Sequence, residues 1–371
     1  MPRLPTSLLL HARHIDPILP ILLRSCRDIT SARNELRWLR EHVKDLPKNG
    51  RRPGPLTLAK LCLERSRGKP LQYILGNQPF GDLDILCRPG VLIPRLVSPS
   101  LTLTQKNANS DSPETEAYTT FLAQLIGENI SKLSTAYPGG CGHRLRVLDL
   151  CTGTGCITLL SHAMLSPYIR DLTIMGIDIS PGAVSLARQN LDWNVREGHL
   201  HPVAREQVTF EQGDVFNKSS PVNGQWDVVI SNPPYISPQG FNKDTIRSVR
   251  NYEPKLALVP PARVQSQQPV PDHVHGDMFY PKLLEIASNV EAKLVLMEVD
   301  GRSQALRVRQ MIHDMRAWDG CEFWMDEPGN RKSSGIYDTE GNENKPRLIG
   351  LGHERSVVCW RQEGQTWLGW D

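Results

Sequence analysis

The sequence contains no run of apolar residues that approaches the roughly 18 needed to span a membrane. It also lacks a strong excess of charge, because 43 lysines and arginines stand against 40 aspartates and glutamates and leave a formal net charge of +3. Aromatic residues are scarce, at 6% of the chain. These features argue against a membrane-bound protein and do not require a nucleic-acid partner. The 371 residues instead predict a globular chain that is long enough for two domains.

Recognised metal-binding patterns are missing as well. The 8 cysteines are scattered without a Cys-x-x-Cys pair, and the 11 histidines include no His-Glu-x-x-His. The cysteine spacing argues against structural zinc and favours a reducing compartment. His273 and His275 lie in a stretch rich in proline and glutamine, which predicts a solvated loop rather than a metal site. We therefore expect no metal.

The most informative segment is Asn232-Pro233-Pro234-Tyr235, which follows an apolar run at 226–231 that is typical of a buried strand. A planar NH2 group needs one acceptor for each hydrogen, and the Asn232 side-chain oxygen and the Pro233 carbonyl can supply both. Proline lacks an N–H and stiffens the loop, so Pro234 and Tyr235 would form pocket walls. The alternative is an ordinary Asn-Pro turn. The segment predicts four catalytic residues that hold a planar nitrogen for methylation.

A glycine-rich turn earlier in the chain indicates a nucleotide pocket. An apolar strand pattern at 145–150 runs into a turn of small residues, Cys151-Thr152-Gly153-Thr154-Gly155, and a helical pattern follows from Cys156 to Met164. Glycine allows close approach of the backbone, and the helix N-terminus offers free N–H groups to a bound anion. Asp149, within the strand pattern, would at least orient the turn.

Two acidic residues follow at the ends of later strand patterns. The pattern at 172–177 ends in Asp178, at about the spacing from which a carboxylate reaches ribose hydroxyls. The pattern at 207–211 leads to Asp214 and its neighbour Val215, where the carboxylate could meet an adenine edge or could simply cap the turn. With the glycine turn and Asn232, these residues form the predicted cofactor site.

Four strand ends that carry a glycine turn, two acids and Asn-Pro-Pro-Tyr resemble the class I S-adenosylmethionine-dependent methyltransferases. The resemblance implies an α/β fold with a Rossmann-like, doubly wound sheet of seven strands, and S-adenosylmethionine as the cofactor. A Rossmann dehydrogenase would need a third glycine in the turn and would leave Asn232 without a role.

Flanking motifs narrow the resemblance to the protein-(glutamine-N5) methyltransferases of the HemK/PrmC type. The matching segments are Pro70 to Gly76, Phe80-Gly81, Gly90 to Arg95, Tyr252-Glu253-Pro254 and Gly276-Asp277. The similarity covers nearly the whole chain, from residue 30 to residue 362. It implies methyl transfer to the N5 amide of the glutamine in the Gly-Gly-Gln motif of a peptide-chain release factor, by a monomer without sequence-specific contact to nucleic acid.

Two alternative functions remain open. An N6-adenine methyltransferase of DNA or RNA would use the same two acceptors, but it needs a region rich in arginine and aromatic residues for a flipped base, and residues 240–275 do not provide one. The other alternative is a catalytically disabled methyltransferase-fold protein that only binds translation factors.

The second alternative arises from an insert. In the family the Ile-Pro-Arg loop runs directly into Pro-Glu-Thr-Glu, whereas here Arg95 and Pro113 are separated by residues 96–112. The insert is polar, and its apolar residues follow neither a helical nor a strand periodicity. Its length keeps the reading frame, as the length of a short retained intron would. The other explanation is a tolerated surface loop. The sequence leaves open which is right and whether this exact chain is active.

The chain divides into three predicted parts. Residues 1–75 are mostly helical, with a helix beginning near Ser31, and the resemblance assigns this domain to recognition of the protein substrate. Residues 76–115 form a hairpin connector with the insert, and 116–371 form the methyltransferase domain. A later strand pattern ends with Glu298 and Asp300, for which we expect a solvated strand end.

The start of the chain is typical of a mitochondrial transit peptide. Its first 27 residues contain one acidic residue, Asp16, against four arginines, Arg3, Arg13, Arg24 and Arg27. Pro17, Pro20 and the alternative of a plain amphipathic first helix argue against it. We expect a mitochondrial protein, with the cytoplasm as the alternative. The sequence identifies neither the release factor nor a cleavage position.

Overall fold

The computed structural model describes residues 3–46, 55–94, 114–136, 144–217, 222–262, 270–329 and 347–369. The predicted insert at 96–112 lies outside these residues. The chain forms two compact units. The first contains Met1–Gln78, Cys87–Pro89 and Ile246–Glu253, and the second contains Pro79–Leu86, Gly90–Thr245 and Pro254–Asp371. In the described residues, every helix is too short or too polar to cross a lipid bilayer.

The first unit is helical. Its helices are α1 (Thr6–Ile15), α2 (Leu19–Cys26), α3 (Ile29–Asp45), α4 (Pro55–Ser66), α5 (Leu71–Leu75) and α11 (Arg247–Tyr252). Ala12, Leu22 and Leu23 are fully buried in its apolar core, so the arginine-rich start of the chain is a structural part of this unit. The predicted start of α3 near Ser31 is wrong by a few residues, because the Asp28 carboxylate caps this helix and accepts a hydrogen bond from the Ser31 N–H at 2.8 Å.

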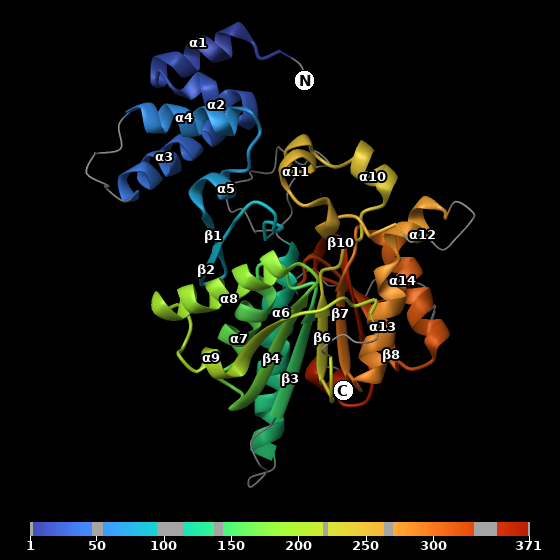
Figure 1. Cartoon of the computed structure of the whole chain (residues 1–371). Helices are drawn as coiled ribbons and strands as arrows, with labels where there is room; N and C mark the ends of the chain where they lie inside the picture. Colours follow the sequence, from blue (N-terminus) through green and yellow to red (C-terminus); the bar gives the residue numbers. More distant parts are fainter. Residues whose placement is uncertain are drawn as a thin grey trace. The chain divides into compact units, whose positions relative to one another are not determined.

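The second unit is built on an 8-stranded sheet in the order β5-β4-β3-β6-β7-β10-β8-β9 (Figure 1). The strands are β3 (Arg144–Leu150), β4 (Asp171–Asp178), β5 (Val208–Gln212), β6 (Val228–Ser231), β7 (Leu294–Glu298), β8 (Gly320–Glu327), β9 (Arg347–Ile349) and β10 (Leu351–Trp360). Strands β3 to β7 pair in parallel, and β10 runs antiparallel to both of its neighbours. The predicted α/β class is confirmed, although the prediction of seven strands missed the short β9 beside β8.

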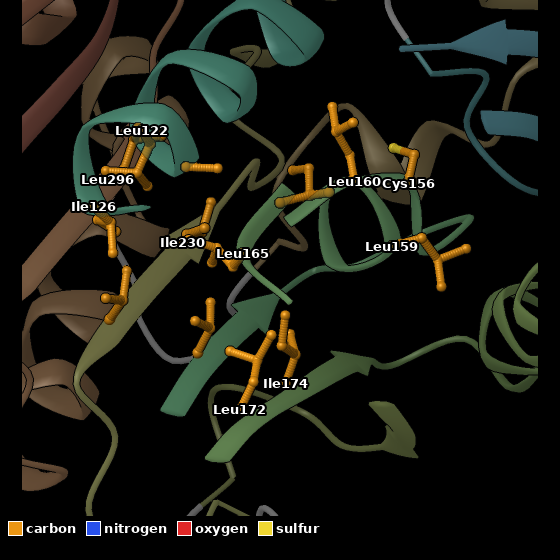
Figure 2. Packing of buried hydrophobic residues seen from close by; sticks show 14 of the residues in the cluster. Leu122, Ile126, Cys156, Leu159, Leu160, Leu165, Leu172, Ile174, Ile230 and Leu296 are labelled. Carbon is orange, nitrogen blue, oxygen red and sulfur yellow. The ribbon is translucent and has the colours of Figure 1, made fainter. Parts of the chain in front are cut away.

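Helices cover both faces of this sheet. They are α6 (Glu114–Ala136), α7 (Cys156–Leu165), α8 (Pro181–Arg196), α9 (Ala204–Gln207), α10 (Pro238–Lys243), α12 (Asp272–Gly276), α13 (Phe279–Asn289), α14 (Arg302–Met315) and α15 (Gly364–Trp367), with a 3-10 turn at Lys255–Ala257. Side chains of a strand alternate between faces, so Val228 and Ile230 of β6 join one apolar cluster and Val229 joins the other. Figure 2 shows the first cluster, in which Leu122 of α6 and Leu165 of α7 lie near the strands.

Strands β1 (Asn77–Phe80) and β2 (Leu83–Leu86) form a hairpin within the segment for which the sequence predicts a connector. Two asparagines of α8 hold it, because the Asp84 N–H donates to Asn194 Oδ1 at 2.9 Å and the Leu86 N–H donates to Asn190 Oδ1 at 2.7 Å. Both asparagines are fully buried. Asn190 also donates to the Thr154 carbonyl at 2.9 Å, so one side chain joins the hairpin to the glycine-rich turn.

Candidate active site

The strand register places the predicted site residues in one row. Strand β3 pairs Leu150 with Ile177 of β4 and with Ser231 of β6, and Ser231 in turn pairs with Met297 of β7. Parallel neighbours lie about 4.8 Å apart, so the residues that follow these four form a row at the carboxyl edge. That row consists of Asp178, Cys151, Asn232 and Glu298. The strand order reverses between β3 and β6, the position where open α/β sheets bind ligands.

The two glycines of the turn after β3 have different tasks. Gly153 and Gly155 both have positive φ, at 57° and 80°. A Cβ atom on Gly155 would come within 2.9 Å of the Phe210 ring, so this glycine permits close packing. A Cβ atom on Gly153 would meet no atom within 4 Å, so its backbone faces open space. Helix α7 begins directly after Gly155 without a side-chain cap, which leaves its first N–H groups available to a ligand.

Cys151 also has a left-handed backbone conformation, with φ of 66°, which costs a non-glycine residue about 1 kcal/mol or more. Its side chain packs against the second apolar cluster. Burial, followed by the charges of Asp178 and Asp149, raises the pKa of the Cys151 thiol well above its ordinary value. The thiol therefore stays neutral and is not a nucleophile.

The acids near the turn hold backbone and side-chain donors. Asp149 is fully buried, and its Oδ2 accepts hydrogen bonds from the hydroxyls of Thr152 at 2.6 Å and Thr158 at 2.7 Å. Burial raises the pKa of Asp149 to about 7, against the opposing effect of these two hydroxyls. Its Oδ1 has no hydrogen-bond partner among the described residues. The geometry thus gives Asp149 the role of orienting the turn.

Asp178 and Asp214 both lie at the same edge of the sheet. The Asp178 carboxylate accepts from the N–H groups of Gly153 at 2.9 Å and Ser180 at 2.8 Å. Burial raises its pKa, and those two backbone hydrogen bonds oppose the rise. A carboxylate has about four lone-pair positions, so it can still accept from two further hydroxyls. Asp214 Oδ1 accepts from the Phe216 N–H at 2.9 Å, which caps the turn, and Val215 is buried in the second cluster.

The Asn-Pro-Pro-Tyr loop has buried prolines at its centre, flanked by half-buried Asn232 and Tyr235. Asn232 Nδ2 donates to the hydroxyl oxygen of Thr115 at 3.4 Å. Within the described part of the chain, no group donates a hydrogen bond to Asn232 Oδ1 or to the Pro233 carbonyl. The two acceptors that the sequence predicts for a planar NH2 group therefore receive no hydrogen bond from any residue that the structure describes.

The backbone beside the loop is fixed on both sides. The Ser231 hydroxyl donates to the Leu150 carbonyl at 2.7 Å and ties the end of β6 to β3. On the other side, Gln304 Nε2 donates to the Tyr235 carbonyl at 3.3 Å, and the Ile236 N–H donates to the Leu258 carbonyl at 2.9 Å. The acceptors are thus held in place before any ligand arrives.

Glu298 departs from the sequence-based expectation. Its side chain is only 1% exposed, and it accepts hydrogen bonds from the hydroxyls of Thr115 at 2.9 Å, Tyr118 at 2.8 Å and Tyr235 at 3.0 Å. The prediction of a solvated strand end is wrong for Glu298, because α6 lays Thr115 and Tyr118 against the end of β7. It holds for Asp300, which is exposed. The only sequence signal for Thr115 was its place in the Pro-Glu-Thr-Glu motif.

A cavity of about 300 Å³ lies beside the loop and is lined by Tyr235 and by charged side chains of both signs, among them Asp300, Arg302 and Arg307. The expected solvated loop around His273 instead contains the short helix α12. Within the described ranges, no three or more His, Cys, Asp or Glu side chains gather in a way that could hold a metal ion.

Several known proteins are similar to this chain. A family model described as "Methyltransferase domain" matches residues 142–312. The "Mitochondrial MRF1 N(5)-glutamine methyltransferase MTQ1" of Saccharomyces cerevisiae is 35% identical over 261 residues, which cover 70% of this chain and 68% of that protein. The "Probable MRF1 mitochondrial N(5)-glutamine methyltransferase mtq1" of Schizosaccharomyces pombe is 31% identical, and the alignment covers 81% and 86% of the two chains. A "Release factor glutamine methyltransferase" of Chlorobaculum tepidum is 32% identical, with 58% and 63% covered.

Proposed function

This chain belongs to the family of N(5)-glutamine methyltransferases, and from that membership we propose that it methylates the glutamine of the Gly-Gly-Gln motif of a peptide-chain release factor. The methyl group goes from S-adenosylmethionine to the N5 atom of the side-chain amide. The observation that carries this proposal is the pair of acceptors, Asn232 Oδ1 and the Pro233 carbonyl, which receive no hydrogen bond from the described residues and lie beside a glycine turn at the reversal point of the sheet.

The residues at the sheet edge fit S-adenosylmethionine. The open side of Gly153 gives the cofactor access to the backbone, and the uncapped start of α7 offers N–H groups to its carboxylate. Asp178 keeps lone pairs that would accept from ribose hydroxyls, and Asp214 and Val215, at the same edge of the sheet, would contact the adenine. Bound there, the cofactor supplies an electrophilic methyl group on its sulfonium.

The chain's own residues orient the acceptor nitrogen. An amide nitrogen is a weak nucleophile, because its lone pair is delocalised into the carbonyl, so most of the rate gain must come from orientation and charge stabilisation. Asn232 Oδ1 and the Pro233 carbonyl accept its two hydrogens and stabilise the positive charge that develops on it. Pro234 and Tyr235 wall the pocket around the flat amide. No strong base is needed, since the alkylated nitrogen loses its proton readily.

The release factor is the protein partner in this proposal, and the helical first unit contributes to its recognition. The enzyme acts as a monomer and has no sequence-specific contact with nucleic acid. Its compartment is the mitochondrion, which the names of the two fungal relatives support. A cytoplasmic location would instead direct it to a cytoplasmic release factor.

Mass spectrometry of a mitochondrial release factor, incubated with S-adenosylmethionine and the purified protein, tests this function. Asn232→Ala should lower kcat by roughly 10²-fold, as expected for loss of one transition-state hydrogen bond. Asn289→Ala is the matched control, because Asn289 is exposed at the end of α13. A second chain without residues 96–112 shows whether the insert affects activity.

Methylation of the Gly-Gly-Gln glutamine by at least one of the two chains is the expected result. The proposal is overturned if neither chain modifies the glutamine while adenine in DNA or RNA becomes methylated. It is also overturned if both chains bind the cofactor and the release factor without any turnover, which is the behaviour of a disabled methyltransferase-fold protein.

A further inference from the structure

We propose that the buried carboxylate of Glu298 determines which end of the Asn232 side-chain amide faces the substrate, and that it does so through the hydroxyl of Thr115. Glu298 and Thr115 are positioning residues in this proposal, whereas Asn232 touches the substrate. The inference rests on the proposed function, because it explains how Asn232 comes to offer an acceptor to the target nitrogen. It adds two residues, from α6 and the end of β7, to the machinery of the loop.

The first step is the direction of the hydrogen bonds to Glu298. Each hydroxyl that forms a described hydrogen bond with the Glu298 side chain donates to it, so the carboxyl group acts as the acceptor. The hydroxyls of Thr115 and Tyr118 both donate to its Oε2, and the Tyr235 hydroxyl donates to its Oε1. Because Glu298 is almost completely buried, the carboxylate depends on these protein donors in place of water.

The second step concerns the Thr115 hydroxyl, which has a single hydrogen. That hydrogen is directed to Glu298, so only the lone pairs of the oxygen remain for other partners. The side-chain amide of Asn232 lies 3.4 Å away and must therefore present its NH2 group to Thr115. The opposite end of the amide, Oδ1, then faces away from Thr115 and is free to accept.

The reversed arrangement is unfavourable for a simple reason. If Asn232 turned its oxygen toward Thr115, two acceptors would face each other with no hydrogen between them. Thr115 could relieve this only by turning its hydrogen away from Glu298, which would deprive a buried carboxylate of one of its donors. The oxygen and nitrogen of an amide are nearly equal in size, so packing alone does not select between the two orientations.

The orientation decides whether the target amide can bind productively. The nitrogen of a primary amide carries two hydrogens and meets two groups of the loop. The Pro233 carbonyl is always an acceptor, whereas the Asn232 side chain can present either its oxygen or its NH2 group. With Oδ1 forward, both hydrogens have acceptors. With the NH2 group forward, two donors would face each other at the reacting nitrogen. The same carboxylate also anchors Tyr235, so one group sets the position of the loop and the polarity of its first side chain.

Tyr118 donates its hydrogen bond to Glu298 independently of pH. It is 1% exposed, and burial together with the charge of Glu298 raises the pKa of its hydroxyl well above the usual range. The hydroxyl therefore remains neutral and continues to donate at any physiological pH. Thr115 and Tyr118 are one helical turn apart on α6, so a single rigid element supplies two of the hydroxyl donors named above.

Steady-state kinetics on the full chain, with a release factor as substrate, provide the first test. Thr115→Val removes the hydroxyl at nearly constant shape and should lower kcat by about 10- to 100-fold, the usual effect of losing a supporting hydrogen bond. Thr115→Ser retains the hydroxyl and should restore most of the rate. The KM for the release factor and the Kd for S-adenosylmethionine should stay within a factor of about two. The reason is that the chain of hydrogen bonds from Glu298 through Thr115 to Asn232, called the relay below, affects only the reacting amide.

A double-mutant cycle separates the relay from a merely structural role of Glu298. Glu298→Gln makes the acceptor neutral and allows a donor to face Thr115, so kcat should fall about 10-fold. If Glu298 acts through the Thr115 hydroxyl, the double variant Glu298→Gln/Thr115→Val should be little slower than Thr115→Val alone. If the loss of kcat in the double variant equals the product of the losses in the two single variants, the relay is refuted. The exposed Glu128, also on α6, provides the control Glu128→Gln.

A measurement without turnover distinguishes failure of the relay from failure of the proposed function. In protein with labelled asparagine side chains, the Asn232 NH2 hydrogens should give nuclear Overhauser contacts to the Thr115 methyl, and Glu298→Gln should weaken them. If these contacts are present but no glutamine is methylated, the amide orientation stands and the proposed function fails. If the NH2 group points away from Thr115 in the wild type, the relay is refuted whatever the activity.

Discussion

The free energy of unfolding of Asp149→Asn, minus that of the wild type, should grow as the pH rises. Asp149 is fully buried at the end of β3, where it accepts hydrogen bonds from Thr152 and Thr158 and has one oxygen without a partner in the described structure. Asparagine has nearly the same shape, and its carbonyl oxygen can accept from the same two hydroxyls. The substitution therefore removes a buried charge and leaves the geometry of the turn in place.

The sign and size of the effect follow from the pKa of Asp149, which burial raises from 3.8 to about 7. Between these values the folded protein retains a proton that the unfolded chain has released, so stability decreases as the pH rises. The loss amounts to about 1.4 kcal/mol per pH unit and is complete once the pH exceeds about 7. Across the whole interval it approaches about 4 kcal/mol in the wild type, and Asp149→Asn does not suffer it.

Urea unfolding of the cofactor-free protein at several pH values between about 4.5 and 8 provides the measurement. Over this range the folded and the unfolded protein differ in the number of protons that they bind. The quantity of interest is the stability of Asp149→Asn minus that of the wild type, since other acids titrate equally in both. This difference should rise steadily toward pH 7 and then level off. Asp171→Asn, at an exposed position on β4, serves as the control. A difference that is constant with pH, or one that falls as the pH rises, would refute the reasoning.

Two further substitutions test how the pocket is held. Cys151→Gly should change the free energy of unfolding by less than about 1 kcal/mol, because the relief of strain at φ of 66° is offset by the lost packing of the partly buried side chain; a larger change in either direction would contradict this. Asn190→Ala removes the hydrogen bonds to Leu86 and Thr154 and should cost about 2 to 3 kcal/mol in stability. Hydrogen exchange at the Leu86 amide should become faster in that variant but not in Gln189→Ala, and equal protection in both would argue against the role of Asn190.

The order of the parallel strands, the glycine turn and the helix after it in the second unit was predictable from the sequence. Apolar strand patterns, the glycine turn and the helix that begins at Cys156 are local signals, because they reflect side-chain periodicity and backbone conformations within a few residues. The same holds for the Asn-Pro-Pro-Tyr loop, whose acceptors follow from the residues themselves. The first residue of a helix was harder to predict where two nearby residues can both cap it, as Asp28 and Ser31 can at the start of α3.

What the sequence could not determine is which distant residues meet at the end of each strand. Glu298 and Asp300 have the same local pattern, yet one is buried under three hydroxyls and the other is exposed. The difference arises because Thr115 and Glu298 are 183 positions apart and meet only when α6 packs on the sheet. The sequence by itself determined the chemistry of the loop, and the tertiary structure decided which groups orient it, because burial and hydrogen-bond direction depend on long-range packing.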